Sequence, residues 1–531
     1  MGANWTAHVA QSAGMRMGEA SRELELKVEL ASAAWERLLE NPALRTLADD
    51  ITRTRELTSV YFDTEDCVIH RHGMSLRMRP TERGWRQTFK AETGVRGGVS
   101  NPLEIEVDLD AAKPDPRAAE GPAGEKLRAL LGHDALRPMF QTVVRRSLRR
   151  LVLPEGGALE LALDEGYVRA GEATAELREA ELELLAGDAS SLLTVAEALL
   201  AGVEFRFGTE SKAERGYRLL RGEPDPAVKP EKGIPEPLTR GQSCAEAFAA
   251  ACRSAARQIL HNWQVVLESP DPEGPHQLRI GLRRLRTALH AFRPAIDSDA
   301  LRQLAHDARH LSCRVGELRD LDVLSADIVG PLASCGGDRD GFASLVKLLR
   351  RRITRQRTRL QRELGDARWS AFRLRLALLE HGAGWSKDAA QDAASQPALS
   401  QARLAMRKAW KRVKRYAQRL EQLSVEERHE LRKRLKRLRY TAEFFLPLFE
   451  GAEAGRFVKR IRRILDTFGY LNDVAMAEML IDICRAEGTA DADRDQAAGY
   501  VLGWHSARAE NAWEGVPLRW GRLRRSERFW R

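Results

Sequence analysis

Cysteine is scarce in this sequence, and long apolar runs are missing. The six cysteines are scattered over 531 residues and include no CxxC pair of the kind that binds zinc or exchanges disulfides. That pattern favours a reduced, cytoplasmic compartment. No apolar run approaches the roughly 18 residues of a membrane span, and the first residues lack the apolar core of a signal peptide. We therefore expect a cytoplasmic protein without membrane contact, in which residues 1–19 form a disordered lead.

Charge is unevenly distributed along the chain, whose net charge is +10. Residues 1–230 carry 31 basic and 38 acidic side chains, whereas the remainder carries 55 basic and 38 acidic ones. A strongly basic second half suggests a polyanionic partner. The overall composition, 43% hydrophobic and 31% charged, is otherwise typical of a globular protein.

A proline-rich stretch divides the chain. Residues 222–241 carry five prolines, so they are predicted to form a semi-rigid linker and neither a helix nor an interior strand. Short alternating segments before it indicate an α+β domain, and long amphipathic segments after it indicate an all-α domain. The predicted parts are the α+β domain at 20–221, the linker at 222–240 and the helical domain at 241–531.

Charged and apolar residues alternate in several strand-like segments of the first part. A β-strand over 23–27 would place Glu23, Glu25 and Lys27 on one face. The alternation recurs at Arg77 and Arg79; at Thr88 and Lys90; at Glu104, Glu106 and Asp108; at Glu160 and Asp164; and at Glu179, Glu181 and Glu183. A solvated strand face would explain any one of these segments, but their recurrence predicts a barrel with a charged interior.

With Ser211-Lys212 added, these segments in this order resemble the CYTH family of triphosphate tunnel metalloenzymes over roughly residues 20–221. The resemblance implies an eight-stranded antiparallel β-barrel with flanking helices, whose tunnel binds a triphosphate together with Mg²⁺ or Mn²⁺. Elementary electrostatics agrees, because buried carboxylates repel one another unless hard divalent cations neutralise them, and buried cations need an anion.

The resemblance also implies roles for the tunnel residues. The cations expected to bind and activate the triphosphate are Lys27, Arg77, Arg79, Lys90, Lys212 and either Arg145 or Arg146. The last two point to opposite strand faces, and the sequence does not decide which enters the tunnel. The carboxylates expected to hold the metal are Glu23, Glu25, Glu181 and Glu183, with Glu104, Glu106, Asp164 and Glu179 as further ligands or water-orienting groups. A metal-polarised water would then attack the terminal phosphorus.

The helical part contains an internal repeat. The segment 276–286 aligns without a gap with 429–439, and forty residues past each histidine 316–320 aligns with 469–473. Each histidine is followed by cations at i+3, i+7 and i+10, which fall along one helical stripe. The first stripe is His276, Arg279, Arg283 and Arg286; the second is His429, Arg432, Lys436 and Arg439.

The two stripes resemble the CHAD family, the conserved-histidine α-helical domain, over about residues 241–525. That resemblance implies two pseudo-symmetric four-helix bundles whose stripes face a shared groove that binds inorganic polyphosphate. Nucleic acid is disfavoured as the polyanion, because single-strand binding normally uses aromatic platforms and the stripes contain only Tyr440.

Taken together, the sequence predicts a metal-dependent inorganic triphosphatase that cleaves tripolyphosphate to pyrophosphate and phosphate, joined to a polyphosphate-binding helical domain. Two alternatives stay open at this point. One is a thiamine- or nucleoside-triphosphate phosphohydrolase, because the tunnel motifs are shared among these activities. The other is a non-catalytic polyphosphate-binding protein.

Overall fold

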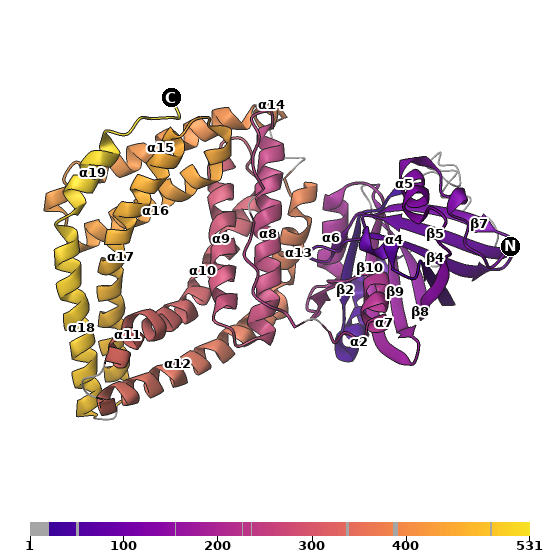
Figure 1. Cartoon of the computed structure of the whole chain (residues 1–531), viewed down its shortest axis with the longest axis horizontal. Helices are drawn as coiled ribbons and strands as arrows, with labels where there is room; N and C mark the ends of the chain where they lie inside the picture. The colour runs from indigo at the N-terminus through magenta and orange to yellow at the C-terminus, as the bar shows by residue number, and fades with distance from the viewer. Residues whose placement is uncertain are drawn as a thin grey trace. The chain divides into compact units, whose positions relative to one another are not determined.

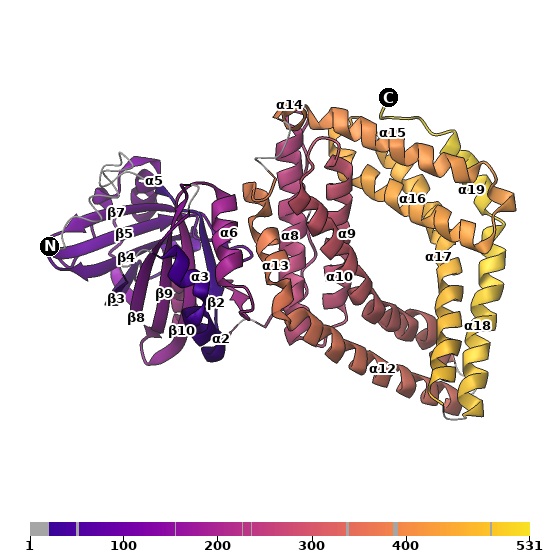
Figure 2. The same cartoon turned by 180° about the vertical axis from the view of Figure 1, so that it is seen from behind.

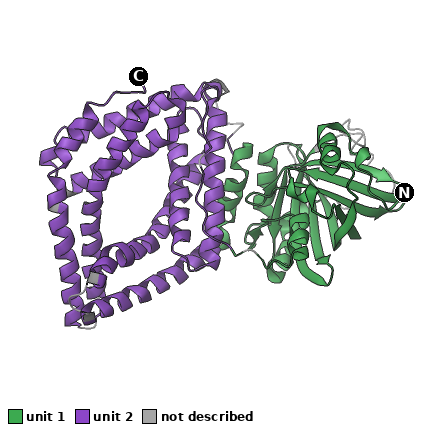
Figure 3. Ribbon diagram, viewed as in Figure 1, with its two compact units in different colours: residues 1–227, 366–383 green, residues 228–365, 384–531 purple. Residues whose placement is uncertain are grey.

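The computed structural model describes residues 21–48, 52–153, 156–225, 227–234, 236–335, 339–385, 391–488 and 491–531. The predicted disordered lead at 1–19 lies outside these residues. The chain divides into two compact units (Figure 3): unit 1 comprises residues 1–227 and 366–383, and unit 2 comprises residues 228–365 and 384–531.

Unit 1 is built on one antiparallel sheet (Figure 1). Its strands are β1 (Ser21–Arg22), β2 (Glu25–Glu29), β3 (Arg53–Asp63), β4 (Met74–Thr81), β5 (Gly84–Ala91), β6 (Val99–Ser100), β7 (Leu103–Leu109), β8 (Arg137–Val152), β9 (Ala158–Ala170), β10 (Ala173–Ala186) and β11 (Arg206–Phe207). The order across the sheet is β1-β7-β5-β4-β3-β8-β9-β10-β2-β11, and β6 pairs with β2.

The sheet is curled, because two strands that are neighbours in the sequence pair near opposite ends of this strand order. Strand β1 pairs with β7, whereas β2, only two residues further along the chain, pairs with β10. The predicted curled antiparallel sheet with a tunnel-like interior is confirmed. The described residues form eleven strands, of which β1, β6 and β11 have two residues each. Closure into a barrel of eight strands stays a prediction.

Helices of unit 1 pack on this sheet (Figure 2). The helices of this unit are α2 (Ser32–Glu40), α3 (Pro42–Leu47), α4 (Val68–Arg71), η1 (Pro116–Ala118), α5 (Gly121–Leu131), α6 (Ala189–Leu199), α7 (Lys212–Leu220), η3 (Ala367–Trp369), α13 (Ser370–Leu378) and η4 (Leu379–His381). Helix α6 lies between the sheet and α13. A capping box of Ser211 and Glu214 starts α7, which fixes Lys212 as its first residue.

Helix α13 belongs to unit 1 although it lies within the helical half of the sequence. It packs against α6, and Arg375 pairs with Glu197 of that helix at 2.7 Å. Most of its side chains are buried, including Phe372, Leu374 and Leu378, which explains why its sequence shows little polar periodicity.

Unit 2 is built from helices, and its described residues contain no strand, as predicted. Its helices are α8 (Cys244–Glu268), α9 (Glu273–Phe292), α10 (Asp299–Val323), η2 (Leu324–Val329), α11 (Gly330–Cys335), α12 (Arg339–Gly365), α14 (Gln391–Ser395), α15 (Ala398–Ala417), η5 (Leu420–Gln422), α16 (Val425–Phe445), η6 (Leu446–Leu448), α17 (Glu453–Ala486), α18 (Ala492–Trp513) and α19 (Val516–Arg524). The arrangement as two four-helix bundles stays a prediction. Within the described residues, no helix is long and apolar enough to cross a lipid bilayer.

The proline-rich segment is partly fixed along α8. Asn262 exchanges two hydrogen bonds with the backbone of Glu231, at 2.9 and 3.2 Å, and Arg284 of α9 donates to the Gly233 carbonyl at 2.7 Å. The described residues between 222 and 240 contain neither helix nor strand. Unit 1 ends at Ala227 and unit 2 begins at Val228, so only a short stretch of unit 2 precedes this bound segment.

Candidate active site

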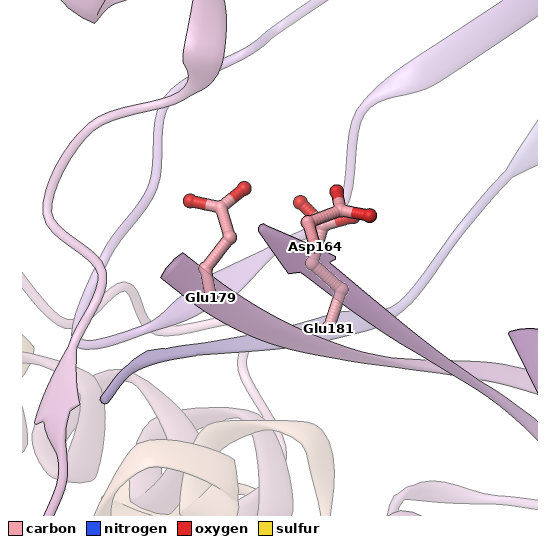
Figure 4. Close-up of side chains that lie close together, drawn as sticks. All are labelled: Asp164, Glu179 and Glu181. Atoms are coloured by element: carbon pink, nitrogen blue, oxygen red, sulfur yellow. The ribbon is translucent and has the colours of Figure 1, made fainter. Parts of the chain in front are cut away.

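Three carboxylates of β9 and β10 converge inside the curled sheet (Figure 4). Asp164 and Glu179 lie opposite each other in the ladder between these strands, and Glu181 follows on the same face of β10. One carboxylate oxygen from each lies within 4.8 Å of the others. Asp164 and Glu179 are fully buried, so their charge needs neutralising partners.

The partners of this trio are three cations from different elements. Lys27 of β2 lies 2.8 Å from Glu181 and 3.3 Å from Glu179. Arg146 of β8 lies 2.6 Å from Asp164 and 2.7 Å from Glu181. Lys212 of α7 contacts all three carboxylates.

These contacts decide the ionisation of the trio. Burial opposes ionisation of Glu181, yet Lys212, Lys27 and Arg146 hold the pKa of Glu181 well below its usual range. Burial is likewise outweighed at Asp164, whose pKa is lowered by Lys212 and Arg146. The carboxylates of Asp164 and Glu181 are therefore ionised beside these cations.

A second ion-paired group lies on β5 and β7. Lys90 contacts Glu104 directly and lies 3.7 Å from Glu23, while Arg77 of β4 lies 3.7 Å from Glu104. Burial would raise the pKa of Glu104, but Lys90 and Arg77 outweigh it and lower that pKa to about 2.

Three further carboxyl groups, those of Glu23, Glu25 and Glu183, lie close to other carboxyls and have few cations nearby. Burial and the neighbouring Glu104 and Glu183 raise the pKa of Glu23 to about 10. Burial and Glu160 raise the pKa of Glu183 to about 8, and burial and Glu181 raise the pKa of Glu25. The nearest ammonium groups are Lys90, 3.7 Å from Glu23, and Lys27, 4.0 Å from Glu25.

Arg79 shows the opposite imbalance. Its Nε donates to the Ser59 hydroxyl at 3.0 Å, and no carboxylate pairs with it among the described residues. Burial, with Arg77 and Arg146 nearby, lowers the pKa of Arg79 to about 9. The interior formed by the described residues therefore holds a positive charge without a carboxylate partner on the β4 side, and carboxyl groups around β2 and β10 that retain protons because few cations lie near them.

In unit 2 the two basic stripes come together through α9 and α16. The Tyr440 ring lies under both Arg283, at 4.3 Å, and Arg439, at 4.6 Å. Arg279 pairs with Asp320 at 2.7 Å, and Asp320 belongs to the repeated motif of α10. Cation–π contacts with one ring thus join a residue of each stripe.

Crowding of cations is strongest at Lys436. Burial, with Arg432, Arg283 and Arg279 nearby, lowers the pKa of Lys436 to about 7. Burial and nearby cations also lower the pKa of His276 and of His429. Arg286 is exposed and has Arg309 and Arg437 as neighbours, so it lies apart from the Tyr440 contacts.

Comparison with known families assigns a family to each half of the chain. Residues 21–217 match the CYTH domain family, and residues 250–482 match the CHAD domain family. The chain joins a CYTH domain to a CHAD domain. The resemblance deduced from the sequence motifs is thereby confirmed for both halves.

Known proteins share one half or the other with this chain. A 203-residue segment is 28% identical to a protein named inorganic triphosphatase from Haemophilus influenzae; the match spans 37% of this chain and 55% of that relative. A crystal structure of the CHAD domain from Ricinus communis is 25% identical, with a TM-score of 0.44, and covers 56% of this chain and 98% of its own. A putative adenylyl cyclase from Hippeastrum, described as having a dominant triphosphatase activity, is 21% identical, with a TM-score of 0.27, over 38% of this chain and 98% of its own.

The CYTH site contains most of the residues singled out from the sequence. Arg146 lies opposite Asp164 in the strand ladder and enters the carboxylate trio, whereas Arg145 lies opposite Glu165 and is exposed. Glu106 lies apart from the trio and accepts a hydrogen bond from Thr88 at 2.9 Å.

Two residues near this site received no role in the sequence analysis. Glu160 lies opposite Glu183 in the ladder, and burial raises the pKa of Glu160. Glu160 lies four residues before Asp164 on one strand, and this spacing could have predicted that both point to the same face. Ser59, the partner of Arg79, lies in an unremarkable stretch of β3 and gave no signal.

The carboxylates of the CYTH site fit a divalent cation. Oxygen ligands in a buried acidic pocket suit Mg²⁺ and Mn²⁺. The Asp164 trio is already neutralised by Lys27, Arg146 and Lys212, so a metal there would have to displace an ammonium group. Glu23, Glu25 and Glu183 have fewer cations beside them and raised pKa values, so a divalent cation there would replace protons and would not have to displace the cations of the Asp164 trio.

Proposed function

We propose that this protein is a metal-dependent inorganic triphosphatase, which hydrolyses tripolyphosphate to pyrophosphate and phosphate. The observation that carries the proposal is the uneven pairing within one buried site. Arg79 lacks a carboxylate partner among the described residues, and the carboxyls of Glu23, Glu25 and Glu183, which have few cations nearby, hold protons that a divalent cation could replace. A linear polyanion that carries a divalent cation at one end has the complementary distribution. The name of the Haemophilus influenzae relative supports an inorganic substrate.

The roles of the residues follow from their charges. Arg77, Arg79 and Arg146 would bind phosphoryl oxygens and stabilise the charge on the departing pyrophosphate. Glu23, Glu25 and Glu183 would hold Mg²⁺ or Mn²⁺, which polarises water and phosphoryl oxygens when bound. Lys27 and Lys212 hold the Asp164 trio in place and favour the ionised form of Glu181, and Lys90 does the same for Glu104.

For the CHAD domain we propose binding of inorganic polyphosphate between the stripes of α9 and α16. What supports this is the set of cations around Tyr440, which are drawn together although they repel one another. A polyanion would relieve that repulsion and release counterions. Arg283, Arg432, Lys436 and Arg439 are the residues we expect to contact it most closely, with Arg279 released from Asp320.

Arg145 and Arg146 offer a matched pair for testing the catalytic half of the proposal. Arg146→Ala is expected to lower the rate of phosphate release from tripolyphosphate about 100-fold, because a positioned charge is lost next to the phosphoryl group. Arg145→Ala, one residue away but exposed, should change the rate less than about twofold. Both rates are measured with the full chain in the presence of Mn²⁺. Equal losses in the two variants would contradict the assignment of Arg146.

Polyphosphate binding is expected to weaken as the pH rises above 7. Lys436 has a pKa of about 7 in the free protein, and a bound polyanion would raise it. Binding above that pH therefore takes up a proton, and affinity should fall as the pH rises, by at most about tenfold per pH unit. Calorimetry in two buffers of different ionisation enthalpy measures this uptake.

Lys436→Arg is the control for this pH dependence, because arginine keeps the charge but does not titrate in this range. The variant should bind polyphosphate at pH 7 but lose the slope between pH 7 and pH 9. A slope that persists unchanged in Lys436→Arg would show that another group takes up the proton.

A further inference from the structure

Arg373 of α13 makes a defined contact with the segment that follows α6. Its two terminal nitrogens donate to the Phe205 carbonyl at 3.2 and 3.1 Å. Its guanidinium also lies over the rings of Phe205, at 4.4 Å, and Phe207, at 5.1 Å. The Arg373 side chain is buried, and Phe205 and Phe207 pack edge to face with each other. Arg373 therefore fixes both the backbone and the side chains of this segment.

The segment held by Arg373 borders the strand that carries Lys27. Phe207 of β11 lies opposite Val28 of β2 in the ladder. The next residue, Gly208, donates its backbone N–H to the Lys27 carbonyl at 3.1 Å. A Cβ added to Gly208 would lie 2.7 Å from the Lys27 stem, so the side chain of Lys27 runs directly over this glycine.

The other backbone group of Lys27 is hydrogen-bonded to Gly98, the residue before β6, on which the Phe207 ring packs. The Lys27 N–H donates to the Gly98 carbonyl at 2.7 Å. Gly98 has a φ of +81°, and a Cβ there would lie 2.3 Å from the Phe207 ring, so the ring packs directly on this glycine. Gly208 thus donates to the carbonyl of Lys27 and lies under its side-chain stem, and Phe207 packs on the glycine whose carbonyl accepts the Lys27 N–H.

We infer that Arg373 is a positioning residue for Lys27, so that a segment from the helical half of the sequence sets the geometry of the CYTH site. This inference rests on the proposed function of that site. Lys27 contacts both Glu179 and Glu181 in the buried trio, where its ammonium has little room to adjust. A shift of β11 by a fraction of an ångström would therefore move a charge within the site, and misplacement on that scale is costly to catalysis.

The test compares Arg373→Ala with Arg375→Ala in the full chain. Both arginines lie on α13, but Arg375 pairs with Glu197 of α6 and is not among the contacts to Phe205 or Phe207. Arg373→Ala is expected to lower kcat for tripolyphosphate about tenfold with little change in KM. Arg375→Ala should change kcat less than about twofold relative to the wild type, although it removes an ion pair between α13 and α6. Equal effects of the two substitutions would overturn the inference.

A double-mutant cycle with Lys27→Met separates positioning from general stability. If Arg373 acts through Lys27, adding Arg373→Ala to Lys27→Met should lower kcat no further. A further loss of about tenfold in the double variant would show that Arg373 acts by another route and would overturn the inference. If Arg373→Ala does not fold, Arg373→Gln, which keeps a donor for the Phe205 carbonyl, takes its place in the cycle.

The proposed function can fail without leaving the inference untested. Failure of the wild-type chain to release phosphate from tripolyphosphate in the presence of Mg²⁺ or Mn²⁺ would refute the proposed function. The same four proteins are then compared by calorimetric titration with tripolyphosphate and Mn²⁺. Coupling between Arg373 and Lys27 in the binding constant would support the positioning role, whereas independent effects, or no effect of either substitution, would overturn it.

Discussion

Replacing Glu183 with glutamine is expected to lower the rate of phosphate release from tripolyphosphate about 100-fold, because one ligand to the metal is lost. The same substitution is expected to stabilise the metal-free protein. The expected stabilisation comes from the crowding of Glu183 with Glu160, Glu25 and Glu104. The pKa of Glu183 is raised to about 8 in the folded protein, above the value of an unfolded glutamate. Wild-type stability therefore falls as the pH rises from about 4.5 towards 8, and the variant escapes this loss.

Glu181→Gln provides the contrast on the same strand. It should also lose activity, but it should destabilise the protein, because Lys27, Arg146 and Lys212 each lose a partner. Breaking a buried ion pair from one side costs about 3–5 kcal/mol. Melting temperatures measured in EDTA at pH 8 compare both variants with the wild type. The account fails here if Glu183→Gln retains full activity, or if its melting temperature falls as far as that of Glu181→Gln.

Removing four stripe cations is expected to weaken polyphosphate binding more than about 100-fold, because the removed charges are the ones a bound chain would neutralise. The variant replaces Arg279, Arg283, Arg432 and Lys436 with alanine. A plot of log affinity against log salt should also flatten by about three units, as estimated for four lost contacts to a single strand.

The control removes four exposed arginines of α12 instead: Arg350, Arg351, Arg355 and Arg359. Both variants carry the same net charge, so a diffuse attraction would weaken equally in each. We expect the control to lose less than about threefold in affinity. Comparable losses in both variants, measured by calorimetry at one salt concentration, would rule out the stripe groove.

The sequence predicted the curled sheet because period-two alternation survives in every segment where one strand face is charged and buried. Lys27, for example, is almost completely buried between the core residues Leu26 and Val28. It also predicted the two basic helices, because a stripe repeated in register is improbable by chance. Local pattern was sufficient for both.

The pairing of charges needed long-range geometry. The choice between Arg145 and Arg146 depends on the register of β8 against β9, which no local pattern encodes. Which carboxylates lack a cation partner depends on where the ammonium groups of Lys27, Lys90 and Lys212 lie in the fold. These three lysines belong to three separate elements. The packing of α13 on α6 joins residues more than 170 positions apart, and no pattern in either segment predicts contact with the other.

The most direct test of the central claim is a substrate panel with the wild-type chain. Phosphate release is measured with tripolyphosphate, thiamine triphosphate and ATP, each with Mg²⁺, with Mn²⁺ and with EDTA in excess. The account predicts the highest kcat/KM for tripolyphosphate, equal amounts of phosphate and pyrophosphate as products, and no release in EDTA. Release that persists in EDTA, a preference for ATP or thiamine triphosphate, or no release from any of the three would contradict it.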